Sequence, residues 1–105
     1  MEEMSSFLEV FGDYPVNRVL DFLITFDEFD YSMTEIAENA GVGYSTLLLF
    51  WAKLEAKGIV LSTRKVGKSK MYKLNRENPV VVELVKLHWQ VCQQEMQKML
   101  KPIEA

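Results

Sequence analysis

Hydrophobic residues recur at helical spacing along most of the chain and alternate with polar residues in only one short region. Val16, Val19 and Leu23 share one helix face, and apolar neighbours widen it nearly all round, so we expect this helix at the centre of the fold. Apolar and β-branched residues on either side of Gly67 are typical of a hairpin. The pattern predicts, in chain order, helices over 5–11, 15–26, 32–41 and 44–57, a hairpin over 59–75 with its loop at 64–70, and a helix from 79 to about 100 that Pro102 stops.

Local signals at the helix ends support this order. Ser32 and Glu35 form a capping-box pattern, in which the Ser32 hydroxyl accepts a bond from the Glu35 amide and the Glu35 carboxylate reaches back. Asn78 precedes Pro79 as an N-cap precedes a first helical residue. Gly58 is placed to end the predicted helix over 44–57. The predicted fold class is therefore mainly α with a small β-hairpin (α+β).

Length and composition narrow the protein class. A chain of 105 residues with 49% hydrophobic and 26% charged residues is typical of one soluble domain. Its apolar runs are far shorter than the roughly 18 residues of a membrane span, so we expect no membrane association. The single cysteine, Cys92, cannot form an internal disulfide, which is typical of the reducing cytoplasm. We therefore expect a cytoplasmic protein and exclude disulfide-built secreted proteins and cysteine-built zinc modules.

The charge is distributed unevenly along the chain. The formal net charge is −3, but residues 1–42 hold ten acids and one base, whereas residues 43–75 hold seven bases and one acid. Such a layout lets one face attract a polyanion although the whole protein is acidic. A lysine-rich hairpin can also serve only to keep its edge soluble and unpaired, so both interpretations stay open at this point. The hairpin bases that lie closest together are Arg64, Lys65, Lys68 and Lys70.

Residues 34–58 carry the most specific pattern. Small Ala37 suits a close helix crossing and Gly41 suits the turn that follows, after which apolar residues recur with the spacing of one buried helix face. This region resembles the winged helix-turn-helix of small prokaryotic transcriptional regulators, closest to compact archaeal regulators of the MarR/ArsR-like kind. The resemblance covers about residues 12–90 and is carried by YSMTEIA at 31–37, GVGYSTL at 41–47, LE at 54–55, GIV at 58–60 and YKLN at 72–75.

The resemblance implies a recognition helix (44–57) in the DNA major groove and a basic wing (59–75) along the phosphates. Hydroxyls and free amides in the first turn of that helix suit phosphate oxygens. Leu48 and Leu49 depart from the polar or basic residues usual in such regulators, because leucine makes no bidentate base contact. They could touch thymine methyl groups, bind a protein, or be buried by the N-terminal segment. The implied DNA-binding residues are Tyr44, Ser45, Thr46, Leu48, Leu49, Lys53, Arg64, Lys65, Lys68 and Lys70.

The last helix carries two apolar stripes. One follows a heptad spacing and predicts a dimer interface, and the other, at Leu84, Leu87 and Val91, is suited to packing on the winged domain. The alternative is that the whole helix folds over its own domain. We predict residues 1–77 as the DNA-binding domain and residues 78–105 as its dimerisation helix. The predicted dimer residues are Val82, Val85, Trp89, Cys92, Met96 and Met99.

The sequence gives little support for a catalytic or metal-binding site. His88 and Cys92 share a helix face, but one histidine and one cysteine fit ordinary packing better than a metal site. We predict no cofactor, no metal and no enzymatic activity. The sequence favours a homodimeric, sequence-specific regulator of transcription that binds double-stranded DNA. The alternative is a winged-helix protein-interaction module that uses Leu48 and Leu49.

Overall fold

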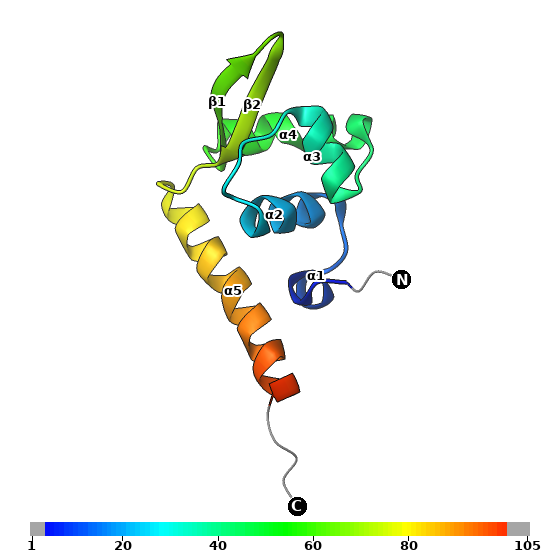
Figure 1. Ribbon diagram of the computed structural model, residues 1–105, viewed down its shortest axis with the longest axis vertical. Coiled ribbons are helices and arrows are strands. Elements are labelled where there is room, and N and C mark those ends of the chain that lie inside the picture. Colours follow the sequence, from blue (N-terminus) through cyan, green and yellow to red (C-terminus); the bar gives the residue numbers. More distant parts are fainter. Residues whose placement is uncertain (1–3, 101–105) are drawn as a thin grey trace, which may run out of the picture.

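The computed structural model describes residues 4–100 and places five helices around and beside one hairpin (Figure 1). The predicted α+β class and the order of elements are confirmed, and Pro102 lies outside the described residues. No described helix is long and apolar enough to cross a membrane. The elements are α1 (Ser6–Phe11), α2 (Pro15–Thr25), α3 (Met33–Ala40), α4 (Tyr44–Ala56), β1 (Val60–Val66), β2 (Ser69–Leu74) and α5 (Pro79–Leu100).

The helix ends form as their residues predict. Ser32 and Glu35 make the reciprocal capping box, with the Glu35 amide donating to the Ser32 hydroxyl at 3.2 Å and the Ser32 amide donating to the Glu35 carboxylate at 2.9 Å. Gly41 ends α3 with a φ of 68°, in the left-handed region that favours glycine. Asn78 caps α5 by accepting from the amide of Val80 at 2.8 Å. Local chemistry thus fixes where the helix-turn-helix begins and turns.

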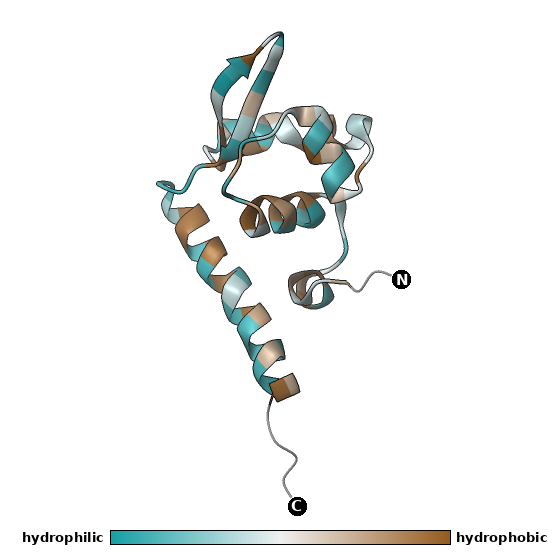
Figure 2. Cartoon of the chain, in the orientation of Figure 1, coloured by the Kyte–Doolittle hydropathy of each residue, from teal (hydrophilic) through white to brown (hydrophobic). Residues whose placement is uncertain are grey.

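Helix α2 forms the centre of the core. Val19, Leu23 and Ile24 are almost completely buried, and α2 packs against α1, α3, α4 and α5. Figure 2 shows that α2 is coloured mainly hydrophobic. The predicted central helix is therefore confirmed. The α4 residues Leu47 and Trp51 are buried against this core, and Trp51 meets Tyr72 of β2 edge to face, which joins α4 to the base of the hairpin.

The strands of the hairpin are longer and its turn tighter than predicted. The expected loop at 64–70 is wrong, because the strands continue to Val66 and resume at Ser69. Gly67 turns the chain with a φ of 60°, as the first central residue of a two-residue hairpin turn requires. A register shift between Ser62 and Arg64 marks a β-bulge. A backbone bridge from Tyr31 to β2 extends the sheet at the base of the wing.

Helix α5 begins beside the hairpin and runs to the opposite end of the molecule, which measures 60 × 32 × 22 Å (Figure 1). Val81, Val85 and His88 are its buried residues, and α1 packs against it. Val85 was predicted at the dimer interface, but it belongs to the core of the protomer and does not face a partner. The last turns of α5 leave the domain, since Met96 and Met99 are exposed.

Candidate nucleic-acid interface

A groove of about 390 Å³ lies where the wing overhangs the helix-turn-helix. One wall is the start of α3 with the first residue of α4, and the other is the hairpin. The groove therefore joins three segments that are far apart in the sequence. Its lining consists of Ser32, Met33, Thr34, Tyr44, Lys65, Lys68, Ser69, Lys70 and Tyr72.

Every charged residue that lines this groove is basic. Lys65, Lys68 and Lys70 line it, and no acidic residue does. Among residues 4–100 these three lysines form no ion pair, and all three are exposed. Three unpaired cations on one concave wall suit an anion that spans the groove.

The two-residue turn at 67–68 sets the position of two of these lysines. Counting back from the turn, Val66 pairs with Ser69 and Lys65 stands directly opposite Lys70 on the neighbouring strand. Like charges at directly opposed positions destabilise a strand pair, so the free hairpin carries a local electrostatic cost. A phosphate between the two ammonium groups would remove that cost. The facing lysines are the feature of the wing that most specifically favours a polyanion.

Arg64 takes a different role from the neighbouring lysines. Its guanidinium donates to Asp30 through Nε at 2.9 Å and Nη2 at 3.0 Å, and the hydroxyl of Thr63 donates to the same carboxylate. The hydrogen bond from Arg64 is the larger cause, and that from Thr63 the second, of a pKa of Asp30 that lies well below its ordinary value of 3.8. Of the four predicted phosphate-binding cations of the wing, Arg64 is therefore engaged by an acid of the α2–α3 loop and braces the bulge.

The exposed face of α4 starts polar and becomes apolar. Tyr44 and Ser45 are exposed in its first turn, Leu48 is 50% exposed and Leu49 is 85% exposed. Burial of one leucine by the N-terminal segment, one of the three interpretations of this pair, is therefore wrong. Thr46 is half-buried and Lys53 is exposed further along the helix. Of the predicted residues of α4, all but Thr46 are exposed, and Tyr44 also lines the wing groove.

The first turn of α4 keeps its amides available. Its N-cap is Gly43, which has no side chain to accept a bond from the helix, and no side-chain cap is formed. The amides of an uncapped first turn have no partner within the helix and carry the positive end of the helix dipole. By contrast, α3 is capped by Ser32. An anion near the groove would therefore meet its free backbone donors at α4.

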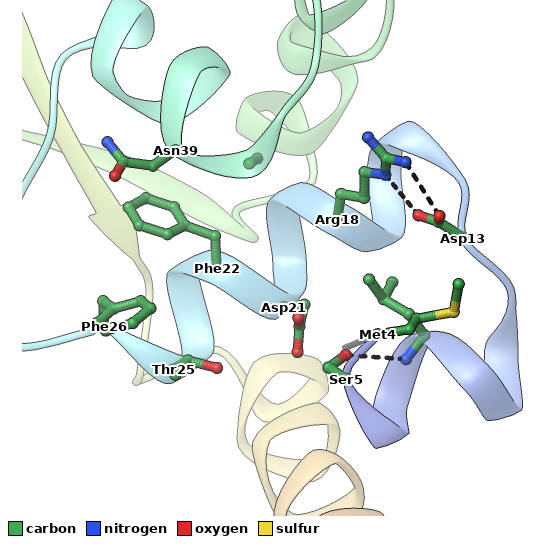
Figure 3. A pocket seen from close by; sticks show the side chains of 11 residues that line it. Met4, Ser5, Asp13, Arg18, Asp21, Phe22, Thr25, Phe26 and Asn39 are labelled. Atoms are coloured by element: carbon green, nitrogen blue, oxygen red, sulfur yellow. Dashed lines mark hydrogen bonds and ion pairs between the residues drawn. The ribbon is translucent and has the colours of Figure 1, made fainter. Parts of the chain in front are cut away.

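A second, larger hollow of about 750 Å³ lies between α1, α2 and α3 (Figure 3). Asp13 accepts from Arg18 Nη2 at 3.0 Å, and Arg18 Nη1 donates to the Gly41 carbonyl at 2.8 Å, which ties α2 to the turn after α3. Asp21 is paired at 2.7 Å with His88 of α5. The charged residues of this hollow are thus engaged within the chain and offer no free cation to a nucleic acid.

The predicted dimer stripe divides between the protomer and solvent. Val82 and Cys92 are half-buried, and burial raises the pKa of the Cys92 thiol, with Asp21 adding to this effect. Trp89 is 47% exposed, and both methionines of the stripe are exposed. Leu84 and Val91 of the second stripe are half-buried as predicted, whereas Leu87 is exposed. The face of α5 that packs on the domain is therefore centred on Val81, Val85 and His88 and not on the predicted second stripe.

Several residues of the interface were missed in the sequence. Thr34 lines the groove from α3 and Tyr72 closes its base, and neither was predicted as a site residue. Asp30 was not singled out in the sequence, although it reaches Arg64 across 34 positions. The one available signal was the alternation in β2, which places Tyr72 and Lys70 on the same strand face.

Solved structures of transcription regulators share this fold. A variant of Lactococcus lactis ZitR in its apo form matches with a TM-score of 0.65 and 16% identity over 92% of this chain and 76% of that chain. A MarR-family transcriptional regulator from Silicibacter pomeroyi matches with a TM-score of 0.61 and 16% identity over 92% and 64% of the two chains. MepR, a transcription regulator of the Staphylococcus aureus multidrug efflux pump MepA, matches with a TM-score of 0.61 and 15% identity over 82% and 62%.

These likenesses establish the fold. The chain adopts the winged helix seen in MarR-type transcriptional regulators, as the sequence resemblance predicted, and it spans about three fifths of the length of MepR. No protein-family model and no curated protein matches the sequence.

Proposed function

We propose that this protein is a transcriptional regulator that binds double-stranded DNA through the wing groove and α4, and that it acts in the cytoplasm without enzymatic activity. The facing pair Lys65 and Lys70 carries the proposal, because two opposed cations beside the open first turn of α4 are arranged for a phosphate backbone. The fold shared with transcription regulators supports it. The predicted partner is therefore duplex DNA.

The residues around the groove would make different contacts with DNA. The three groove lysines would neutralise phosphates along the wing, and Tyr44 and Ser45 would bond a phosphate at the start of α4 through their hydroxyls and amides. Lys53 would reach the backbone further along the groove. Arg64 would hold the wing in place through Asp30 rather than bind DNA itself. Phosphate contacts of this kind orient a protein on the duplex but carry no sequence information.

We further propose that two copies bind together through the distal part of α5. Trp89, Met96 and Met99 expose an apolar surface there. A two-fold dimer would present two α4 helices to half-sites about one DNA turn, roughly 34 Å, apart.

The exposed leucines favour one alternative function. With Leu49 at 85% and Leu48 at 50% exposure, α4 has an apolar face that suits a protein partner. In this alternative the protein is a winged-helix interaction module. It predicts that replacing the groove lysines leaves the function of the protein unchanged, whereas Leu49→Asp abolishes complex formation.

Duplex binding by lysine variants tests the proposal. We expect Lys65→Ala/Lys70→Ala to weaken binding to a labelled duplex of about 30 base pairs by about tenfold or more, since two phosphate contacts are lost in each wing. Lys86→Ala is the matched control, because Lys86 is an exposed lysine of α5 that lies outside the groove. Fluorescence anisotropy measures both affinities. Equal loss in the two variants, or no duplex binding by the wild-type protein, would contradict the proposal.

A further inference from the structure

The middle of the exposed face of α4 lacks hydrogen-bonding groups. Between Ser45 and Lys53 the exposed side chains are Leu48, Leu49 and Ala52. None of these three side chains can donate or accept a hydrogen bond. The other residues of this segment are half-buried or buried against the core. The two central turns of the helix therefore present only aliphatic carbon to whatever lies opposite them.

Polar groups lie at both ends of this aliphatic strip, which consists of Leu48, Leu49 and Ala52. Tyr44 lies at one end beside the lysines of the wing groove, and Lys53 lies at the other, two positions before the exposed acid Glu55. In a duplex the phosphates line the edges of the major groove and the base pairs form its floor. If the charged ends meet the phosphates, the strip between them faces the floor of the groove. The charge pattern thus favours duplex DNA as the occupant of this face.

The floor of the major groove offers one aliphatic group to such a strip. Thymine carries a 5-methyl group there, whereas guanine, cytosine and adenine carry no methyl group and present hydrogen-bond donors and acceptors. A leucine placed over those polar edges would leave them without water or a partner, which is unfavourable. A leucine placed over a thymine methyl replaces water with an apolar contact. Base discrimination by α4 then depends on where the methyl groups lie.

On the premise that the proposed function holds, we propose that Leu48 and Leu49 read thymine 5-methyl groups, so that the protein prefers half-sites with thymines under α4. The two side chains are neighbours on the helix and both are exposed, so they can contact adjacent base pairs. Sequence preference in this protein then comes from apolar contacts, while the groove lysines supply affinity that does not depend on sequence.

Removing only the methyl group tests this directly. The probe is a pair of A·T-rich duplexes of identical sequence, one made with thymidine and the other with 2′-deoxyuridine, which keeps every hydrogen bond. We expect the wild-type protein to bind the deoxyuridine duplex more weakly, by about fourfold for each methyl contacted, the fold-change that corresponds to one buried methylene. Placing 5-methylcytosine in a G·C-rich duplex should strengthen binding, because it restores a methyl group at the same position.

The variant Leu48→Ala/Leu49→Ala separates contact from duplex shape. Alanine favours helix, and both positions are exposed, so we expect the fold and the salt-dependent binding to persist. In this variant the thymidine-to-deoxyuridine affinity ratio should fall to about one. The control Leu87→Ala, at an exposed leucine of α5, should keep the wild-type ratio.

Three results would overturn the inference in distinguishable ways. Equal affinity of the wild-type protein for the two duplexes would refute methyl reading and leave DNA binding intact. An unchanged ratio in the double-leucine variant would assign the preference to duplex shape. No binding to any duplex would refute the proposed function as well, and would favour the protein-interaction alternative for this face.

Discussion

His88 is the one fully buried polar residue found among residues 4–100. Its Nε2 lies 2.7 Å from the Asp21 carboxylate, and no described residue bonds its Nδ1. The ring packs against Phe7 of α1, with centroids 5.1 Å apart. A single side chain thus joins α1, α2 and α5, and it explains why a histidine occupies the inner face of an otherwise apolar helix.

Loss of Asp21 should therefore destabilise the protein. Asp21→Ala leaves the buried imidazole without its hydrogen-bond partner, and we expect the free energy of unfolding to fall by about 1–3 kcal/mol in urea denaturation. Glu83→Ala serves as the control, since its ion pair with Lys86 is exposed and should contribute little. Equal stability of the two variants would show that the His88–Asp21 bond does not hold the three helices together.

Asp30 gives stability a defined pH dependence. Arg64 and Thr63 hold its pKa below the ordinary value of 3.8, so the folded state keeps the carboxylate ionised while the unfolded chain takes up a proton in acid. The contribution is complete at neutral pH and declines as the pH falls below 3.8. We expect the melting temperature of Asp30→Asn to lie below that of the wild-type protein by a constant amount above about pH 5. The difference should shrink in stronger acid, and a parallel pH dependence of the two proteins would contradict this account.

The helices and the hairpin were predictable because their signals are local. Apolar spacing, the Ser32 capping box, Asn78 before Pro79 and glycines at the turns act within a few residues, and each element forms where they indicate. The β-bulge was not predictable, because it depends on Asp30 meeting Thr63 and Arg64 across the fold. The bulge changes the register only between Arg64 and the base of the hairpin, whereas the turn at 67–68 places Lys65 opposite Lys70.

The inner face of α5 was also not predictable, because it too depends on contacts between residues that are distant in the sequence. Helical spacing identifies apolar stripes but does not say which stripe meets the neighbouring helices. Val81, Val85 and His88 face the domain, whereas the sequence favoured a stripe that included Val85 and Trp89 for a partner. The polar side chain of His88 concealed the true inner face, since its partner Asp21 lies 67 positions away. The groove was predictable as a basic wing but not in its lining from α3.

The turn of the wing should be sensitive to one substitution. Gly67 has a φ of 60°, where a side chain is strained although no atom lies within 4 Å of an added Cβ. We expect Gly67→Ala to destabilise the hairpin by about 1 kcal/mol. Lys68→Ala, at the next position, should leave the stability unchanged, because no non-glycine residue among 4–100 has a positive φ. Thermal unfolding followed by circular dichroism measures both, and equal melting temperatures would argue against this turn geometry.

In the whole molecule, acids and bases lie in different regions. Residues 1–42 hold ten acids and residues 43–75 hold seven bases, and the wing lies at one end of a 60 Å long axis while the distal part of α5 lies at the other (Figure 1). An acidic protein can therefore present a basic end to a polyanion. Trp89, Met96 and Met99 are exposed on the distal part of α5, through which we propose that a second copy binds.

Sedimentation tests that second copy. We expect the 12.2 kDa chain to sediment as a dimer, and Met96→Glu to convert it to a monomer because a charge would enter the apolar interface. Leu87→Glu places the same charge at an exposed leucine on another side of α5 and should leave the dimer intact. A wild-type protein that stays monomeric at tens of micromolar would refute the dimer.

The salt dependence of duplex binding tests the central claim most directly. With three groove lysines and Lys53 in each copy and two copies in a dimer, we expect log Kd to rise with log salt concentration with a slope of about 7 between about 50 and 200 mM salt. The slope should fall by about 3 to 4 units in Lys65→Ala/Lys70→Ala, in which four contacts are lost per dimer. A wild-type slope near zero, or a slope that the double variant leaves unchanged, would show that the wing groove does not hold a nucleic-acid backbone.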